Sequence, residues 1–220
     1  MKNGSPSSAT AAPSCHLYLI RHAATQNNLS HPPLLQGQGT DVELSAEGLN
    51  QAAATAAQLE QLRISAVYSS PLRRAVQTAE LIAKPHAIAC TVVDALIEVD
   101  VGSWENRAWD EIAETEPIAY RQFIDNPAKY PYAGGESFTD VAHRAQPAFE
   151  QLMKQRAGER IVVVGHNVVN RVYLAHVAGI PLAKSRDLKQ SNCGINVIRH
   201  RGNRDQLITL NATLHLESTA

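Results

Sequence analysis

The stretch His16-Leu17-Tyr18-Leu19-Ile20-Arg21-His22 ends a short apolar run with an arginine and a histidine. Its alternation predicts a buried strand over 16–20, which puts Arg21 and His22 at the carboxyl end of that strand. In an open α/β sheet, ligands bind beyond the carboxyl ends of the strands. A histidine there can act as a nucleophile, and the planar guanidinium of an arginine can hold a phosphoryl oxygen. An Arg-His pair alone is far commoner on an ordinary loop than in a catalytic site.

A second histidine follows another strand. In Arg160-Ile161-Val162-Val163-Val164-Gly165-His166-Asn167, four consecutive β-branched residues predict a parallel strand buried on both faces. A helix can begin directly after it, with Asn167 as a candidate N-cap. Taken singly, His166 is explained as a capping or core-edge residue. Two histidines at strand-to-helix turns would nevertheless meet at one edge of a sheet.

A third strand, predicted over 66–70, leads into a predicted helix over 71–84 with Ser70 as its N-cap. Arg73 and Arg74 then fall in the first helical turn, where cations oppose the helix dipole by a few tenths of a kcal/mol. This placement indicates an anion nearby. For Arg73 we favour the simpler interpretation of a solvated side chain.

These strand ends belong to an ordered series of motifs that resembles the histidine phosphatase superfamily, also called the phosphoglycerate mutase-like family. The resemblance covers about residues 16–200 and departs from the usual pattern at Ala23 and Asn167, where the family has glycine. The matching motifs are Arg21-His22 with Thr25 and Asn28, Gln36-Gly37, Asp41–Ala52, Ser70–Ala79, the acid loop Leu96–Glu105, Gly134–Ser137 and the strand ending at His166.

The resemblance implies an α/β fold, a three-layer α/β/α sandwich with a mostly parallel central sheet. We expect a flexible N-terminal tail over 1–14 and a single domain over 15–220. A small helical lid insertion is expected at about 99–140, and a packed surface subdomain is the alternative reading of that region. Final strands over 192–199 and 206–211 are expected to form an antiparallel edge. The predicted lid carries most of the aromatic residues: Trp104, Trp109, Tyr120, Phe123, Tyr130 and Tyr132.

The resemblance also implies a reaction. A neutral His22 would attack phosphorus and form a phosphohistidine, with a hydrogen bond from an unidentified partner fixing its tautomer. Glu98 would protonate the leaving oxygen and then activate water. The family's phosphate-binding arginine falls at Arg74. Charge on the phosphoryl group would be offset by Arg21, Arg74 and a protonated His166. Asn28 and Gln36 are weaker candidates for amide contacts with the phosphate.

We therefore expect a metal-independent phosphomonoester hydrolase acting on a small phosphorylated metabolite. The alternatives are a cofactor-dependent phosphoglycerate mutase-type phosphotransferase and, last, a non-catalytic binding scaffold. The region after the acid loop is compact and lacks paired arginines, which favours the hydrolase. No cofactor is expected, and no metal, because the histidines lack metal-binding spacing. The natural substrate stays open, although the aromatic residues of 104–132 would tolerate a bulky or partly apolar leaving group.

Composition excludes some other classes of function. The formal net charge of −1 and the even spread of charge argue against a nucleic-acid face or a polybasic membrane segment. Three widely spaced cysteines, Cys15, Cys90 and Cys193, are typical of reduced thiols in a cytoplasmic protein. A homodimer is one expectation, because dimers occur in the family.

Overall fold

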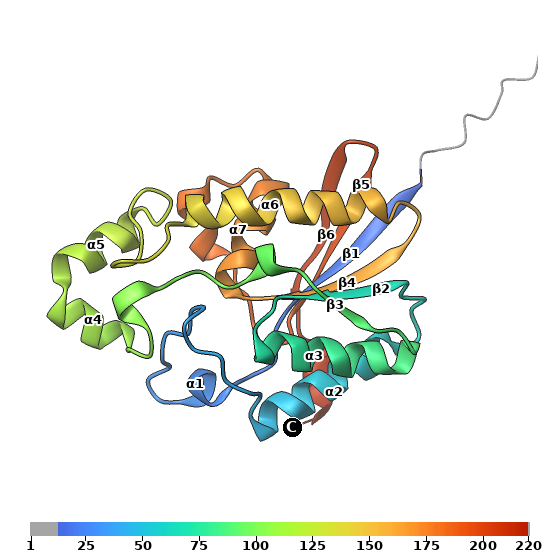
Figure 1. Cartoon of the computed structure of the whole chain (residues 1–220), viewed down its shortest axis with the longest axis horizontal. Helices are drawn as coiled ribbons and strands as arrows, with labels where there is room; N and C mark the ends of the chain where they lie inside the picture. Colours follow the sequence, from blue (N-terminus) through green and yellow to red (C-terminus); the bar gives the residue numbers. More distant parts are fainter. Residues whose placement is uncertain (1–12, 220) are drawn as a thin grey trace, which may run out of the picture.

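The computed structural model describes residues 13–219, so residues 1–12 of the predicted tail lie outside the described part of the chain (Figure 1). The strands form one six-stranded sheet in the order β3-β2-β4-β1-β5-β6. Their bounds are β1 Ser14–Arg21, β2 Ala66–Ser69, β3 Cys90–Val92, β4 Arg160–Gly165, β5 Ile195–Arg201 and β6 Arg204–Ala212. β3, β2, β4 and β1 are parallel, whereas β5 and β6 pair antiparallel. The mostly parallel sheet with an antiparallel edge is therefore confirmed.

Helices cover both faces of this sheet (Figure 1). One face carries α2 (Ala46–Glu60) and α3 (Arg73–Ala83), and the other carries α6 (Phe138–Gln155) and α7 (Asn167–Ala178). The β-branched run of β4 shows why. Val162 and Val164 pack among the apolar residues of α2 and α3, whereas Ile161 and Val163 pack in the larger core with α6 and α7. A strand buried on both faces needs apolar residues at every position, as this run supplies.

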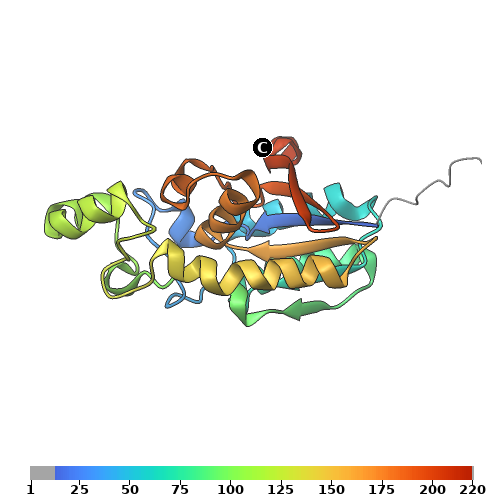
Figure 2. The ribbon, with the colours of Figure 1, turned by 90° about the horizontal axis from the view of Figure 1, so that it is seen from above.

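The segment between β3 and α6 extends past the carboxyl end of β1 (Figure 2). It contains the short helices α4 (Trp109–Thr115) and α5 (Pro117–Asp125), and α1 (Gln26–Leu29) lies in the loop after β1. The side chains of Trp104 and Phe123 are fully buried and meet edge to face, with ring centroids 5.6 Å apart. The ring centroid of Tyr132 lies 4.3 Å from that of Phe123. These rings continue the larger apolar core that lies between the sheet and the α6–α7 layer.

Two predicted helix caps are wrong. The N-cap of α3 is Leu72 in an extended conformation, so the helix begins at Arg73, two residues later than predicted. The hydroxyl of Ser70 is instead in contact with His166. The N-cap of α7 is His166 in an extended conformation, and Asn167 is the first helical residue. The turn before α3 is thus longer than we predicted, whereas the turn before α7 is one residue shorter.

Candidate active site

Two neighbouring strands bring the predicted histidines together. β1 pairs with β4 so that Arg21 lies opposite Gly165, and the backbone N–H of His22 donates to the carbonyl of Gly165 at 3.0 Å. His22 and His166 therefore follow adjacent strand ends, and their ring centroids are 5.1 Å apart. Both side chains are almost fully buried.

His22 has the tautomer that a nucleophile needs. Its Nδ1 lies 2.7 Å from the carbonyl oxygen of Ala23. Because a carbonyl only accepts, Nδ1 carries the proton and Nε2 keeps its lone pair. Burial, Arg74 and Arg21 lower the pKa of His22 well below its usual value, so the ring is neutral at neutral pH. The predicted tautomer-fixing bond therefore exists, and its partner is Ala23.

The backbone after His22 is held from both helices of the α2–α3 layer. The N–H of Ala23 donates to Thr78 Oγ1 at 3.1 Å, and the N–H of Ala24 donates to Gln51 Oε1 at 3.0 Å. Neither Ala23 nor Asn167 has a positive φ. The two departures from the family's glycines thus require no left-handed backbone.

Two arginines lie close to the histidines. Arg74 is fully buried in the first turn of α3, and its Nη atoms donate to the carbonyls of Thr40 and Gly37 at 2.6 and 2.9 Å. Arg21 donates from Nη1 to the carbonyl of Gln190 at 2.8 Å. Burial lowers the pKa of Arg21 to about 10, so it stays cationic at neutral pH. Arg73 is solvent-exposed and pairs with Glu43, which confirms its interpretation as an ordinary surface arginine.

The expected protonated His166 is not favoured in the chain without a bound anion, and it stays a prediction for the phosphate-bound site. Burial, followed by Arg74, His22 and Arg21, lowers the pKa of His166 well below its usual value. The charges of the chain itself therefore favour the neutral ring. His166 Nε2 lies 2.6 Å from Ser70 Oγ, a contact that the sequence did not predict although Ser70 is the last residue of a predicted strand.

Glu98 lies at the start of α7. Its Oε1 accepts from the N–H groups of Val99 and Val169 at 2.9 and 3.3 Å, and its Oε2 accepts from Val168 at 3.2 Å. The first N–H groups of a helix lack partners within the helix and attract anions. The first turn of α7 thus fixes the carboxylate of Glu98 next to His166, the residue that caps the same helix.

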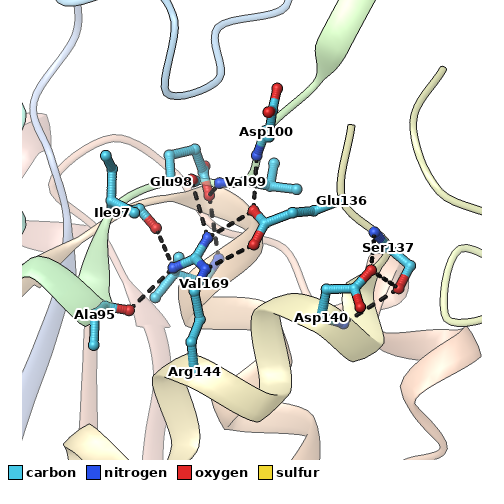
Figure 3. Close-up of polar contacts among 10 residues, drawn as sticks. All are labelled: Ala95, Ile97, Glu98, Val99, Asp100, Glu136, Ser137, Asp140, Arg144 and Val169. Atoms are coloured by element: carbon cyan, nitrogen blue, oxygen red, sulfur yellow. Dashed lines mark hydrogen bonds and ion pairs between the residues drawn. The ribbon is translucent and has the colours of Figure 1, made fainter. Parts of the chain in front are cut away.

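The loop that carries Glu98 is clamped from α6 (Figure 3). Arg144 donates to the carbonyls of Ala95, Ile97 and Glu98 at 3.0, 2.6 and 3.1 Å. The same guanidinium makes a bidentate pair with Glu136 at 2.8 and 2.9 Å. Glu136 Oε2 also accepts from the N–H of Asp100 at 2.9 Å. Sequence reasoning singled out the motif containing Glu136 but missed Arg144.

The two amide candidates lie in the loop after β1. Gln36 Oε1 accepts from Thr25 Oγ1 at 2.9 Å. Asn28 Oδ1 accepts from the N–H of Thr25 at 3.1 Å and from Asn192 Nδ2 at 3.2 Å. Asn192, which also donates to the carbonyl of His22 at 2.8 Å, had no local sequence signal.

A cavity of about 160 Å³ opens at these residues. Arg21, His22, Asn28, Gln36 and Glu98 line it, whereas Arg74 and His166 are fully buried. Buried nitrogen atoms without a hydrogen-bond partner concentrate in this set of residues: Arg21 Nε, Arg74 Nε, Gln36 Nε2 and His166 Nδ1. Unpartnered buried donors are costly, and an anion with several acceptor oxygens would satisfy them.

Residues 13–219 contain no group of three or more His, Cys, Asp or Glu side chains that could hold a metal ion. Within the same range, no helix is both long and apolar enough to cross a membrane.

Comparison with known proteins identifies phosphatases and a mutase-named protein as relatives of this chain. The chain is 32% identical over 201 residues to phosphoserine phosphatase 1 of Hydrogenobacter thermophilus, covering 91% of this chain and 93% of the relative. It is 38% identical to the metal-independent phosphoserine phosphatase of Arabidopsis thaliana, covering 92% of this chain and 83% of the relative. A protein named "Probable phosphoglycerate mutase GpmB" from Salmonella choleraesuis is 31% identical, covering 84% and 85%.

Among solved structures, phosphoserine phosphatase of Entamoeba histolytica in complex with 3-phosphoglyceric acid matches with a TM-score of 0.82 and 28% identity. The match covers 92% of this chain and 99% of that one. The model of the histidine phosphatase superfamily (branch 1) matches residues 17–213, and the chain thus belongs to this superfamily.

Proposed function

We propose that this chain hydrolyses phosphomonoesters without a metal, through a phosphohistidine formed on Nε2 of His22. The observation that carries this proposal is the state of His22. It is buried and neutral, its Nδ1 is bound to the carbonyl of Ala23, and two arginines lie close by. Such an imidazole has its lone pair on Nε2 and a positive environment for the charge of the ester.

In the first step, His22 Nε2 attacks phosphorus and the bond between phosphorus and the leaving oxygen breaks. Arg21 and Arg74 stabilise the equatorial phosphoryl oxygens, and Glu98 in its protonated form gives its proton to the leaving alkoxide. In the second step, Glu98 takes a proton from water, the water oxygen attacks phosphorus, and His22 is released with inorganic phosphate.

His166 has a proposed role that its contacts support. If Ser70 donates its hydroxyl proton to His166 Nε2, the remaining ring proton lies on Nδ1, which has no other partner. Neutral His166 can then donate to a phosphoryl oxygen. A bound phosphate dianion raises the pKa of His166, so the ring can also gain a proton when substrate binds. Asn28 and Gln36 would add contacts from their amide groups.

The mutase alternative is supported by the relative that is named a mutase, and by the transfer of a phosphoryl group to histidine, which both reactions would share. A phosphoglycerate mutase must hold a second anionic group while the phosphate lies on histidine. In the described residues that line the cavity, Arg21 is the only arginine or lysine. This composition favours the hydrolase. The scaffold alternative is weakest, because His22, Arg21, Arg74, Glu98 and His166 are all present.

The size of the cavity supports a small phosphorylated metabolite as substrate. We place the enzyme in the cytoplasm, because Cys15, Cys90 and Cys193 are all free thiols.

The test is phosphate release from a panel of phosphomonoesters in excess chelator, together with trapping of 32P-labelled protein by an alkaline detergent quench. We expect release that resists the chelator and an acid-labile label. Both should be lost in His22→Ala and kept in His143→Ala, which removes a solvent-exposed histidine of α6. Release without label, or label retained in His22→Ala, would contradict the phosphohistidine route.

A further inference from the structure

The cavity beside His22 is nearly free of charge outside the groups that would bind phosphate. Among the described residues that line it, only Arg21 and Glu98 carry charged side chains. Asn28, Gln36 and Asn167 supply amides. The other lining residues form a largely apolar wall: Pro33, Leu34, Leu35, Val99, Val101, Trp109, Tyr132 and Val168.

This wall surrounds the proposed acid. Val99 follows Glu98 in the chain, and the N–H groups of Val99 and Val168 both donate to the Glu98 carboxylate. The side chains of these two valines and of Val101 are at most 4% exposed, so the core fixes their positions. Because Glu98 protonates the leaving oxygen, the carbon bonded to that oxygen must lie against the apolar wall.

The nearest additional cations have other partners. Arg171 donates from Nε to the carbonyl of Leu188 at 2.8 Å, and the guanidinium of Arg186 lies 5.5 Å from the ring centroids of Trp109 and Phe123. Neither arginine lines the cavity. Burial raises the pKa of the Tyr132 hydroxyl, so this group is uncharged. A carboxylate bound near the wall would lose its hydration, and apart from Arg21 the described residues that line the cavity offer it no cation.

We infer that the site selects phosphomonoesters whose leaving alcohol is uncharged and largely apolar, and discriminates against those with a carboxylate near the ester. This inference rests on the proposed function. It also changes the expectation about the aromatic residues of 104–132. Trp109 and Tyr132 line the cavity, whereas Trp104 and Phe123 are buried in the cluster behind them.

The closing experiment compares two esters of the same shape. One is 3-methylbutyl phosphate, and the other is the phosphate ester of 3-hydroxypropanoate, in which a carboxylate replaces the terminal isopropyl group. We expect kcat/KM to be higher for the alkyl ester by about tenfold or more. In the series from ethyl to butyl phosphate, kcat/KM should rise about fourfold for each methylene that becomes buried.

A variant locates the effect in the wall. Val168→Thr keeps the shape of the side chain and adds a hydroxyl, and it should lower the ratio of kcat/KM for 3-methylbutyl phosphate to kcat/KM for methyl phosphate about threefold or more. The matched control is Ile118→Ala, which removes an apolar side chain of α5 that is 76% exposed. Its ranking of the esters should equal that of the wild type.

The outcomes separate the two proposals. If alkyl esters are hydrolysed but the carboxylate ester reacts as well or better, the inference is wrong and the hydrolase stands. If no ester releases phosphate and no phosphoenzyme forms, the proposed function fails, and the inference fails with it.

Discussion

Replacing Arg144 with methionine should damage protonation of the leaving group more than any other step. Arg144 makes five hydrogen bonds, three to carbonyls of the acid loop and two to Glu136 (Figure 3). Methionine fills much of the same space but donates none of them. The guanidinium now lies between the Glu136 carboxylate and the carbonyl oxygens of the acid loop. Without it, the carboxylate would repel those oxygens.

The expected cost in stability follows from partial burial. The side chains of Arg144 and Glu136 are 23% and 24% exposed, so water can reach part of the broken network. Loss of one partner of a fully buried ion pair costs about 3–5 kcal/mol, and exposed pairs are worth less than about 1 kcal/mol. We therefore expect Arg144→Met to lower the free energy of unfolding by about 2–3 kcal/mol.

The expected cost in activity depends on the leaving group. A displacement of Glu98 by about 1 Å would reduce kcat/KM about 100-fold for alkyl phosphates, which need a proton on the leaving oxygen. The leaving group of 4-nitrophenyl phosphate departs without one, so its kcat/KM should fall only about threefold. The parameter kcat/KM is the right one because it reports the steps up to phosphoryl transfer to His22.

The assay measures both esters at a temperature at which urea titration shows the variant to be folded. Arg144→Lys should recover part of the activity, because an ammonium can still donate to Glu136. Arg156→Met is the control, since Arg156 donates to Tyr68 at 2.9 Å and to Glu159 at 3.4 Å, away from the site. Equal losses for the two esters would refute a positioning role for Arg144.

Four further predictions concern the site. The pKa values of His22 and His166 are lowered in the folded chain, so below about pH 6.5 the unfolded chain binds protons that the folded chain does not. Thermal melts should therefore show stability falling from pH 7.5 to 5.5, and a flat profile would contradict this. Arg74→Met should lower kcat/KM about 100-fold or more and move the acid limb of the pH profile to higher pH, because Arg74 lowers the pKa of His22; an unmoved limb would show that Arg74 does not control it. Gly48→Ala would place a Cβ 2.0 Å from the carbonyl oxygen of Ala24 and should cost about 3 kcal/mol in urea unfolding, whereas an unchanged midpoint would mean that this contact relaxes freely. Inorganic phosphate titrated calorimetrically in two buffers near pH 7 should bind with uptake of up to about one proton, reduced in His166→Gln, and uptake unaffected by that change would exclude His166 as the acceptor.

The sequence predicted the parts of the site that depend on strand ends. A β-branched run such as 161–164 has few alternatives to a buried parallel strand, and parallel strands carry their carboxyl ends to one edge. The positions of His22 and His166 follow from that rule. Arg74 gave a second signal, since a cation in the first turn of a helix is locally unfavourable.

Other contacts depend on packing between distant segments. The clamp joins Arg144 to carbonyls 46 to 49 residues away, and His166 meets Ser70 across 96 residues. No local pattern encodes such distances. Glu98 was identified only through the family resemblance, because a single carboxylate in a loop resembles any surface residue. Two of its three backbone donors, the N–H groups of Val168 and Val169, reach it only once α7 has packed against the acid loop.

Binding and activation share the same charges in this site. Arg21 and Arg74 are held by main-chain carbonyls and lie near the two histidines, an arrangement that is costly for the chain alone because no buried carboxylate pairs directly with either guanidinium. These arginines lower the pKa of His22 and so keep Nε2 free to attack. They are also the groups that would hold the charged phosphoryl oxygens. Removing either one should therefore weaken substrate binding and raise the pKa of His22 in a single change, so the two effects must be separated by their pH dependence.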